Sequence, residues 1–274
     1  MKQILTFIGA GNMASSLIGG LIADHYPASN IWVTDPKPEN LERLASTYNI
    51  NTTTDNKKAA EKAEVLILAV KPQIIAQVAT ELAPIVRHNH PLVLTVAAGL
   101  QINSLNRWLG NQTAIVRCMP NTPALIRAGA TALFANSYVS AKQKDMAESI
   151  LRAVGLAVWV EDEAQLDSVT ALSGSGPAYF FLVMEALEKA AVESGLTQEM
   201  AHLLTIQTAV GASRMALESS VSLSQLRQYV TSPGGTTEQA VEALQKNGID
   251  ALFAQALHAA KKRAEELAEQ LGNT

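Results

Sequence analysis

The sequence of 274 residues has a single cysteine, Cys118, which excludes an intrachain disulfide and favours a reducing compartment. Long apolar runs are also missing, because stretches such as residues 65–70 fall far short of the ~20 residues that a bilayer span needs. Glycines enter the N-terminus too early for a signal peptide. The net charge of −4 offers no basic footprint for nucleic acid. We therefore expect a soluble, cytoplasmic protein that binds neither membranes nor nucleic acid.

Motifs of several enzyme classes are absent as well. The five histidines form no spaced pair with an acid that is typical of a metal site, so no metal is expected. No G-x-S-x-G nucleophile elbow occurs, and Cys118 ends an apolar run without any sign of activation. We interpret Cys118 as a packed side chain. This scarcity of acid–base motifs fits a redox reaction in which a cofactor supplies the chemistry.

Proline is scarce in the second part of the chain, where only Pro177 and Pro233 follow Asp162. The first 161 residues carry a net charge of +3 and the remainder −7, which together give the −4 of the whole chain. Because proline is depleted from helix interiors, residues 162–274 are expected to be mostly helical. We predict two domains, residues 1–161 and residues 162–274. The positive first part suits an anionic ligand.

The first part alternates short apolar runs with stretches of helical periodicity, as at residues 17–23 and 39–47. This alternation predicts an α/β fold, a doubly wound and mainly parallel sheet whose last strands could form an antiparallel edge. The expected strands cover residues 4–8, 31–34, 65–70, 92–96, 114–118, 130–134 and 157–160.

Beyond Asp167 the apolar period changes to that of a helix. Residues 249–271 carry one apolar stripe, with charged residues opposite it that are typical of a solvated face. The expected helices at residues 179–191 and 200–217 are apolar or small around much of their circumference. Such helices pack on more than one side, which predicts a subunit interface.

A glycine-rich turn, Gly9-Ala10-Gly11-Asn12-Met13-Ala14, follows the first expected strand and opens a helix. The pattern is G-x-G-x-x-A, a variant of the dinucleotide fingerprint. The first glycine permits the tight turn, the second lets the backbone approach a pyrophosphate, and helix N–H groups point at the anion. The alternative is a purely structural turn. The position after the first strand of a βαβ pattern favours the dinucleotide site.

Two residues after the second strand give conflicting signals about the cofactor. Asp35 could bond a ribose 2′-hydroxyl and favour NADH, whereas Lys37 could accept the 2′-phosphate of NADPH. The loops at Lys71-Pro72 and around Asn121 follow other strands, at the edge where ligands of such sheets bind. Lys71 either lies beside the nicotinamide half or is a solvated residue before a helix that starts at Pro72.

A second glycine-rich segment, Ser232-Pro233-Gly234-Gly235-Thr236-Thr237-Glu238, precedes another helical pattern. It is either an ordinary capped helix start or a carboxylate or phosphate site made of backbone N–H groups, with a threonine hydroxyl facing a reacting atom. The segment Leu172-Ser173-Gly174-Ser175-Gly176-Pro177-Ala178-Tyr179 is either a flexible loop or a closely packed entry into a helix.

Five blocks of the sequence occur in the order seen in pyrroline-5-carboxylate reductases: FIGAGNMASSLIGGL, LAVKPQ, VRCMPNTPALIRAG, TALSGSGPAYFFLVMEAL and TSPGGTTEQAVEAL. The chain resembles this family over essentially its whole length. The resemblance implies an N-terminal Rossmann domain and an all-α C-terminal dimerisation domain. It also implies NAD(P)H-dependent reduction of the C=N bond of L-1-pyrroline-5-carboxylate to L-proline, the last step of proline biosynthesis.

The resemblance also assigns roles to individual residues. Those expected to contact NADPH, with NADH as a possible substitute, are Gly9, Ala10, Gly11, Asn12, Met13, Asp35, Lys37, Asn56, Ala69, Val70, Lys71, Pro72 and Asn121. Those expected to hold the substrate are Val230, Ser232, Gly235, Thr236 and Thr237, with N–H groups of the last three on its carboxylate. Thr237 is the expected catalytic residue, orienting the ring nitrogen and relaying a proton rather than charging the imine alone.

The family resemblance further implies a homodimer with interlocked helical domains, in which the substrate loop could serve the partner's cofactor. Higher assemblies, such as a decamer built from dimers, also occur in the family. Three rivals are a β-hydroxyacid dehydrogenase, an imine reductase for a related cyclic imine, and a non-catalytic NADP-binding sensor. The first needs a lysine soon after a glycine-rich segment, but the first lysine after Ser173 is Lys189.

Overall fold

The computed structural model describes residues 2–272, which form two compact units. The first unit comprises the residues up to Ser175 together with those from Ala259 onwards, and the second comprises Gly176–His258. The first unit therefore includes residues 162–175 and the end of the last helix, which the sequence-based boundary after Glu161 places with the helical part. That boundary stays a prediction.

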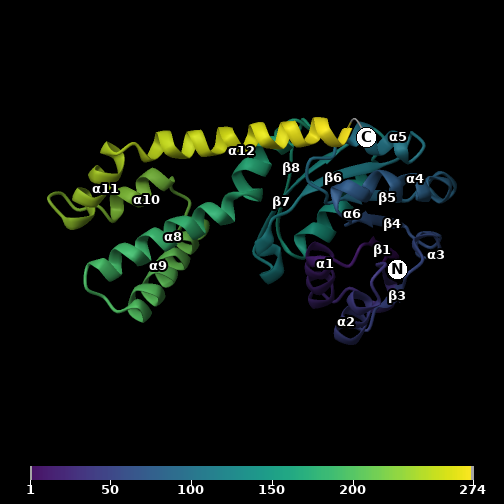
Figure 1. The fold of residues 1–274 in the computed structure, drawn as a ribbon, viewed down its shortest axis with the longest axis horizontal. Coiled ribbons are helices and arrows are strands. Elements are labelled where there is room, and N and C mark those ends of the chain that lie inside the picture. The colour runs from purple at the N-terminus through teal and green to yellow at the C-terminus, as the bar shows by residue number, and fades with distance from the viewer. Residues whose placement is uncertain (1, 273–274) are drawn as a thin grey trace. The chain divides into compact units, whose positions relative to one another are not determined.

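The first unit is built on one sheet of eight strands in the order β3-β2-β1-β4-β5-β6-β7-β8 (Figure 1). The strands are β1 Leu5–Ile8, β2 Ile31–Thr34, β3 Asn51–Thr53, β4 Val65–Leu68, β5 Leu92–Thr95, β6 Ile115–Met119, β7 Gly129–Ala135 and β8 Gly155–Trp159. Neighbouring strands from β3 to β6 are parallel, β6 and β7 are antiparallel, and β7 and β8 are parallel. The first six strands have the order of a dinucleotide-binding doubly wound sheet.

This sheet confirms the predicted α/β class. All four residues of β1, β4 and β5 are buried, as expected for strands that helices cover on both faces. The antiparallel edge is present in β7 and β8, which run opposite to the other strands but parallel to each other. Strand β3 was not predicted, because its polar Asn51–Thr53 segment has no apolar run and is added at the edge beside β2.

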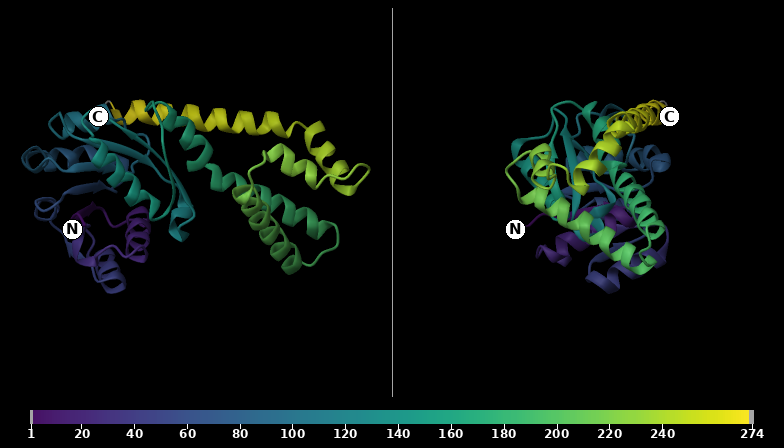
Figure 2. Two further views of the ribbon diagram at one scale, coloured as in Figure 1. Left: turned by 180° about the vertical axis from the view of Figure 1, so that it is seen from behind. Right: turned by 90° about the vertical axis from the view of Figure 1, so that its left-hand side faces the viewer.

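Helices cover both faces of this sheet, and Figure 2 shows the same arrangement from two other directions. The helices are α1 Asn12–Ala23, α2 Pro38–Tyr48, α3 Asn56–Ala60, α4 Pro72–Asn89, α5 Ile102–Trp108, α6 Ala141–Arg152 and α7 Gln165–Val169. One hydrophobic cluster joins α1, α2 and α6 to the sheet, and a second joins α4 and α5 to it. The sheet is therefore the middle layer of three, and loops connect the ends of its strands to the helices on either face.

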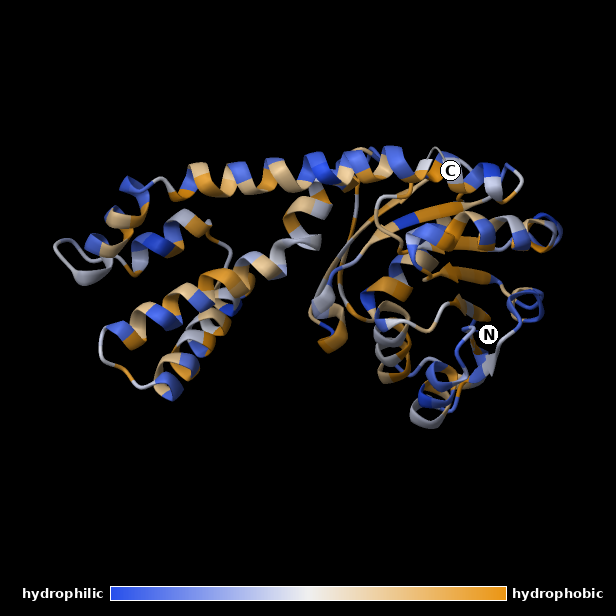
Figure 3. Cartoon of the chain, in the orientation of Figure 1, coloured by the Kyte–Doolittle hydropathy of each residue, from blue (hydrophilic) through white to orange (hydrophobic). Residues whose placement is uncertain are grey.

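The second unit consists of helices. They are α8 Gly176–Glu193, α9 Gln198–Glu218, α10 Leu223–Tyr229, α11 Thr236–Lys246 and the first part of α12 Ile249–Gly272. Helices α8 and α9 pack on each other, and both contain many hydrophobic residues (orange in Figure 3). Phe180, Phe181, Leu203 and Val210 are each more than half exposed in the single chain. The predicted all-helical second part is confirmed, and its exposed apolar faces agree with the predicted interface.

The apolar stripe predicted on the last helix is only partly buried in the single chain. Leu252 and Phe253 are exposed, and Ala264 and Ala268 are the buried residues of α12. Over the residues that the structure describes, no helix combines the length and apolar character that crossing a membrane requires.

Candidate active site

The glycine turn lies between β1 and α1 and is shaped by close contact with the end of β4. Gly9 has φ of +103°, a conformation that L side chains rarely adopt. A Cβ atom on Gly9 would lie 2.7 Å from the carbonyl oxygen of Ala69. The Gly9 N–H donates to the Thr34 carbonyl at 2.8 Å. The turn therefore packs against the last residue of β2 and the first residue after β4.

The start of α1 presents N–H groups that have no acceptor in the chain. The first recorded bond of this helix runs from Ser15 N–H to the Gly11 carbonyl, so the N–H groups of Gly11, Asn12 and Met13 are free of partners among residues 2–272. No acid lies in the first turn of the helix. A Cβ added at Gly11 would meet nothing within 4 Å, so there is open space beside this turn. The turn therefore fits the pyrophosphate of a dinucleotide.

The end of β2 brings Asp35, Lys37 and Asn56 to the same edge of the sheet. The Asp35 carboxylate accepts hydrogen bonds from the N–H groups of Ala10 and Lys37, both at 2.9 Å, and from the side chain of Asn40 at 3.1 Å. The Lys37 side chain is exposed. The side-chain oxygen of Asn56 accepts a bond of 2.6 Å from a buried hydroxyl, that of Thr34 at the end of β2.

The end of β4 leads directly into α4. Pro72 occupies the first turn of that helix and Lys71 is its N-cap residue, with an exposed side chain. Ala69 and Val70 are partly buried and lie against Gly9. Because β2, β1 and β4 are neighbours in the sheet, the predicted cofactor residues that follow them share one edge.

Asn121 follows β6, and both ends of its side chain are engaged within the chain. Its oxygen accepts from the N–H of Ala130 at 2.8 Å, and its amide nitrogen donates to the carbonyl of Ser173 at 3.0 Å. Ser173 lies in a π-helical turn, Thr170–Gly174, just before α8. This turn replaces the flexible loop that was one of the two sequence-based interpretations. Asn121 therefore ties the end of β6 to the start of β7 and to this turn.

Cys118 is fully buried in β6, and burial raises the pKa of its thiol well above the ordinary value. A thiol that cannot ionise near neutral pH is a poor nucleophile. The prediction that Cys118 is a packed residue is confirmed.

The second glycine-rich segment forms a tight turn that caps α11. The Gly235 N–H donates to the Ser232 carbonyl at 2.9 Å, and Gly234 has φ of +71°. Pro233 and Gly234 therefore occupy the central positions of this turn. A carboxylate on the N–H of Gly235, as the sequence predicts, would compete with the Ser232 carbonyl. Val230 and Ser232, the other predicted lining residues, are exposed.

Thr236 and Thr237 are the first two residues of α11. Across residues 2–272, no acceptor pairs with their N–H groups and no hydrogen bond engages the Thr237 hydroxyl. Both N–H groups are therefore available to a carboxylate, beside a hydroxyl that can donate or accept a proton.

Two residues that form hydrogen bonds beside these turns, Glu238 and Asn40, were missing from the predicted site. Glu238, in the first turn of α11, accepts a hydrogen bond of 2.7 Å from the Gly234 N–H. It lies three residues after the N-cap, but a capping box has Ser or Thr at the N-cap and here that residue is Gly235, so the sequence does not carry this motif. Asn40 holds Asp35, and its position five residues further on carries no such motif either.

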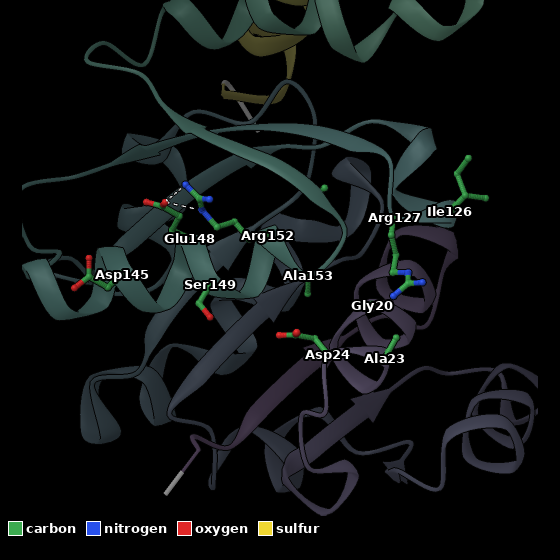
Figure 4. A pocket seen from close by; sticks show the side chains of 11 residues that line it. Gly20, Ala23, Asp24, Ile126, Arg127, Asp145, Glu148, Ser149, Arg152 and Ala153 are labelled. Atoms are coloured by element: carbon green, nitrogen blue, oxygen red, sulfur yellow. Dashed lines mark hydrogen bonds and ion pairs between the residues drawn. The ribbon is translucent and has the colours of Figure 1, made fainter. Parts of the chain in front are cut away.

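A separate hollow of about 770 Å³ lies between α1 and α6 and contains none of the predicted site residues (Figure 4). Its charged lining includes Arg127 and the ion pair between Arg152 and Glu148, whose atoms lie 2.7 Å apart. This hollow contains neither a helix start nor a residue of the two glycine-rich turns, which are the features that mark the candidate site.

Comparison with known proteins matches both parts of the chain. Residues 163–267 match the family model described as pyrroline-5-carboxylate reductase dimerisation, and residues 4–99 match NADP oxidoreductase coenzyme F420-dependent. A pyrroline-5-carboxylate reductase of Pseudomonas aeruginosa is 52% identical over 98% of this chain and 98% of its own length. The chain belongs to the pyrroline-5-carboxylate reductase family.

Solved structures agree. A pyrroline-5-carboxylate reductase from Coxiella burnetii has a TM-score of 0.95 and 50% identity, covering 98% of this chain and 99% of its own. A pyrroline carboxylate reductase from Plasmodium falciparum, crystallised with NADP bound, has a TM-score of 0.86 and 29% identity, with coverage of 97% and 98%. The predicted family is confirmed, and with it an oxidoreductase that uses a nicotinamide cofactor and carries a dimerisation domain.

Proposed function

We propose that the chain reduces the C=N bond of L-1-pyrroline-5-carboxylate with NADPH and forms L-proline, the last step of proline biosynthesis. The observation that carries this proposal is the start of α11, where two unpaired N–H groups adjoin the Thr237 hydroxyl. This arrangement offers two N–H donors to a carboxylate and one hydroxyl to a ring nitrogen. A reducing, cytoplasmic setting is part of the same proposal and rests on the single cysteine, Cys118.

The cofactor would bind along the edge formed by β2, β1 and β4. The N–H groups of Gly11, Asn12 and Met13 would hold its pyrophosphate, and the exposed ammonium of Lys37 would attract the 2′-phosphate of NADPH. Segment 69–72, together with Asn121, would flank the nicotinamide side. When bound, the reduced nicotinamide supplies the hydride.

The substrate carboxylate would bind the N–H groups of Thr236 and Thr237, which fixes the ring and the face that it presents. A protonated imine accepts hydride far better than a neutral one, so the site must favour the proton on the ring nitrogen. The Thr237 hydroxyl is too weak an acid to charge the imine alone. We assign it orientation of the ring nitrogen and proton relay. Val230 and Ser232 would line the entrance to this loop.

Self-association would occur through the helical part of the chain. The dimerisation family model over residues 163–267 supports this, as do the exposed apolar faces of α8 and α9. We propose a homodimer with interlocked helical domains, in which the α11 loop of one subunit serves the cofactor of its partner. A decamer built from dimers is the larger assembly that we propose.

The experiment mixes the purified protein with 1-pyrroline-5-carboxylate and either NADPH or NADH, and it follows the near-ultraviolet absorbance of the reduced nicotinamide. We expect rapid oxidation, faster with NADPH. The absence of oxidation in folded protein that binds either cofactor would overturn the proposed reaction and favour a sensor.

Thr237→Ala and Thr236→Ala form a matched pair, since each removes one hydroxyl from α11 and keeps its backbone N–H. We expect turnover to fall about 10²-fold or more in Thr237→Ala, and Thr237→Ser to restore much of it. Thr236→Ala should stay close to wild type in turnover. Equal activity of the two alanine variants would refute the role of the Thr237 hydroxyl.

A further inference from the structure

The carboxylate of Asp35 is occupied by the protein itself. We infer that Asp35 is a positioning residue that holds the glycine turn in its binding conformation, and that it does not choose between NADH and NADPH. One carboxylate oxygen accepts the Ala10 N–H at 2.9 Å, and the other accepts the Lys37 N–H at 2.9 Å and the Asn40 side chain at 3.1 Å. This inference rests on the proposed binding of a nicotinamide cofactor at this turn.

The hydrogen bond to Ala10 joins the end of β2 to the middle of the glycine turn. The preceding residue, Gly9, donates its own N–H to the Thr34 carbonyl at 2.8 Å. Two consecutive residues of the turn are thus bonded to two consecutive residues at the end of β2. We call this pair of hydrogen bonds, Gly9 to Thr34 and Ala10 to Asp35, the clasp. It fixes where α1 begins and therefore the direction of the N–H groups at the start of that helix.

A carboxylate that selects NADH needs a free oxygen directed at the ribose 2′-hydroxyl. An ionised carboxylate has about four acceptor sites, and three of those on Asp35 are already used. The three donors also offset part of its negative charge, which weakens its repulsion of a 2′-phosphate. The exposed ammonium of Lys37 is then the group that distinguishes the two cofactors.

The test measures the Kd of NADPH and of NADH separately, from the fluorescence change of the reduced nicotinamide on binding, without any substrate. Asp35→Asn keeps the shape of the side chain but turns one acceptor into a donor. We expect the Kd of both cofactors to rise about tenfold, because roughly one charge-assisted hydrogen bond to the turn is lost. The ratio of the two Kd values should stay unchanged.

Two further variants separate positioning from selection. Asn40→Ala removes a hydrogen-bond partner of Asp35 and leaves the glycine turn itself unchanged. It should raise the Kd of NADPH and of NADH by the same factor, and this factor should be smaller than for Asp35→Asn. Lys37→Ala should raise the Kd of NADPH alone and so change the ratio of the two Kd values. If Asp35→Asn does not fold, as judged by circular dichroism, Asn40→Ala still decides, because an unchanged Kd for both cofactors would then overturn the clasp.

Asp35→Asn would overturn the inference if it weakened NADH and left NADPH unchanged or tighter, since that is the signature of a ribose ligand. Unchanged affinity for both cofactors would overturn it equally. Wild-type protein that binds NADPH without reducing 1-pyrroline-5-carboxylate would refute the proposed reaction and leave the clasp standing. Wild-type protein that binds neither cofactor would refute both.

Discussion

Gly9 and Gly11 lie two residues apart in one turn, yet a methyl group added at each would meet opposite surroundings. At Gly9 it would lie 2.7 Å from the backbone oxygen of Ala69 and 3.1 Å from a side-chain methyl of Val70, on a residue with φ of +103°. At Gly11 it would meet nothing within 4 Å, and the backbone, with φ of −72° and ψ of −176°, suits any residue. The two alanine variants should therefore fail in different ways.

Gly9→Ala should lower the free energy of unfolding. The left-handed conformation costs about 1–2 kcal/mol in an L-residue, and overpacking against the backbone adds about 1–3 kcal/mol. Gly11→Ala should change the free energy of unfolding by no more than about 0.5 kcal/mol. Its methyl group would instead enter the open space beside the turn, where the pyrophosphate is proposed to lie, so we expect NADPH to bind at least about tenfold more weakly.

Denaturant titration gives the two unfolding free energies, and fluorescence titration with NADPH gives the affinity of each folded variant. Gly11→Ala binding NADPH as tightly as the wild-type chain would refute the placement of the pyrophosphate over this turn. A Gly9→Ala variant as stable as wild type would show that the close contact with Ala69 carries no cost.

Replacing Arg117 by methionine should lower the free energy of unfolding by about 3–5 kcal/mol, because Glu163 and Asp167 lose the guanidinium at 3.0 and 3.6 Å. In denaturant titration, a loss below about 1 kcal/mol would contradict this. Burial raises the pKa of Tyr26 from 10.0 to about 12. Its stabilising effect is therefore complete below pH 10.0 and is lost as the pH rises towards 12. Tyr26→Phe should flatten this part of the pH dependence of the unfolding midpoint, and an unchanged slope would exclude Tyr26 as its source. Glu238→Gln removes a charge from the loop proposed to hold the substrate carboxylate, so KM should fall several-fold, and an equal or higher KM would argue against that placement.

Hydrophobic pattern alone located most of the fold. The predicted strands at residues 31–34 and 92–96 agree with β2 and β5 to within one residue, because three of the four residues in each strand are apolar and form a short apolar run. Strand β3 was missed since Asn51–Thr53 is polar and pairs only because β2 presents an open edge to it. Pattern shows which residues are buried in a strand, but not which polar segment will extend a sheet.

The two glycine-rich turns were also found from the sequence, because glycine and first-turn residues have fixed spacings relative to a helix start. What the spacing could not show is where the polar groups of the turns are already paired. The bonds of Asp35 to Ala10 and of Asn121 to Ser173 join residues 25 and 52 positions apart. Such pairs depend on how strands and turns meet in space, and a single sequence carries no periodic signal for them.

The two turns use the same physical device, the unpaired N–H groups at a helix start, but in different degrees. The first turn of α1 contains no acid and has open space beside Gly11, which suits the two negative charges of a pyrophosphate. The first turn of α11 contains Glu238, whose carboxylate already bonds the N–H of Gly234. Two free N–H groups and a nearby negative charge suit a ligand with a single carboxylate, such as the proposed substrate. The difference in charge between the two helix starts therefore supports the proposed division, with a doubly charged pyrophosphate at α1 and a single carboxylate at α11.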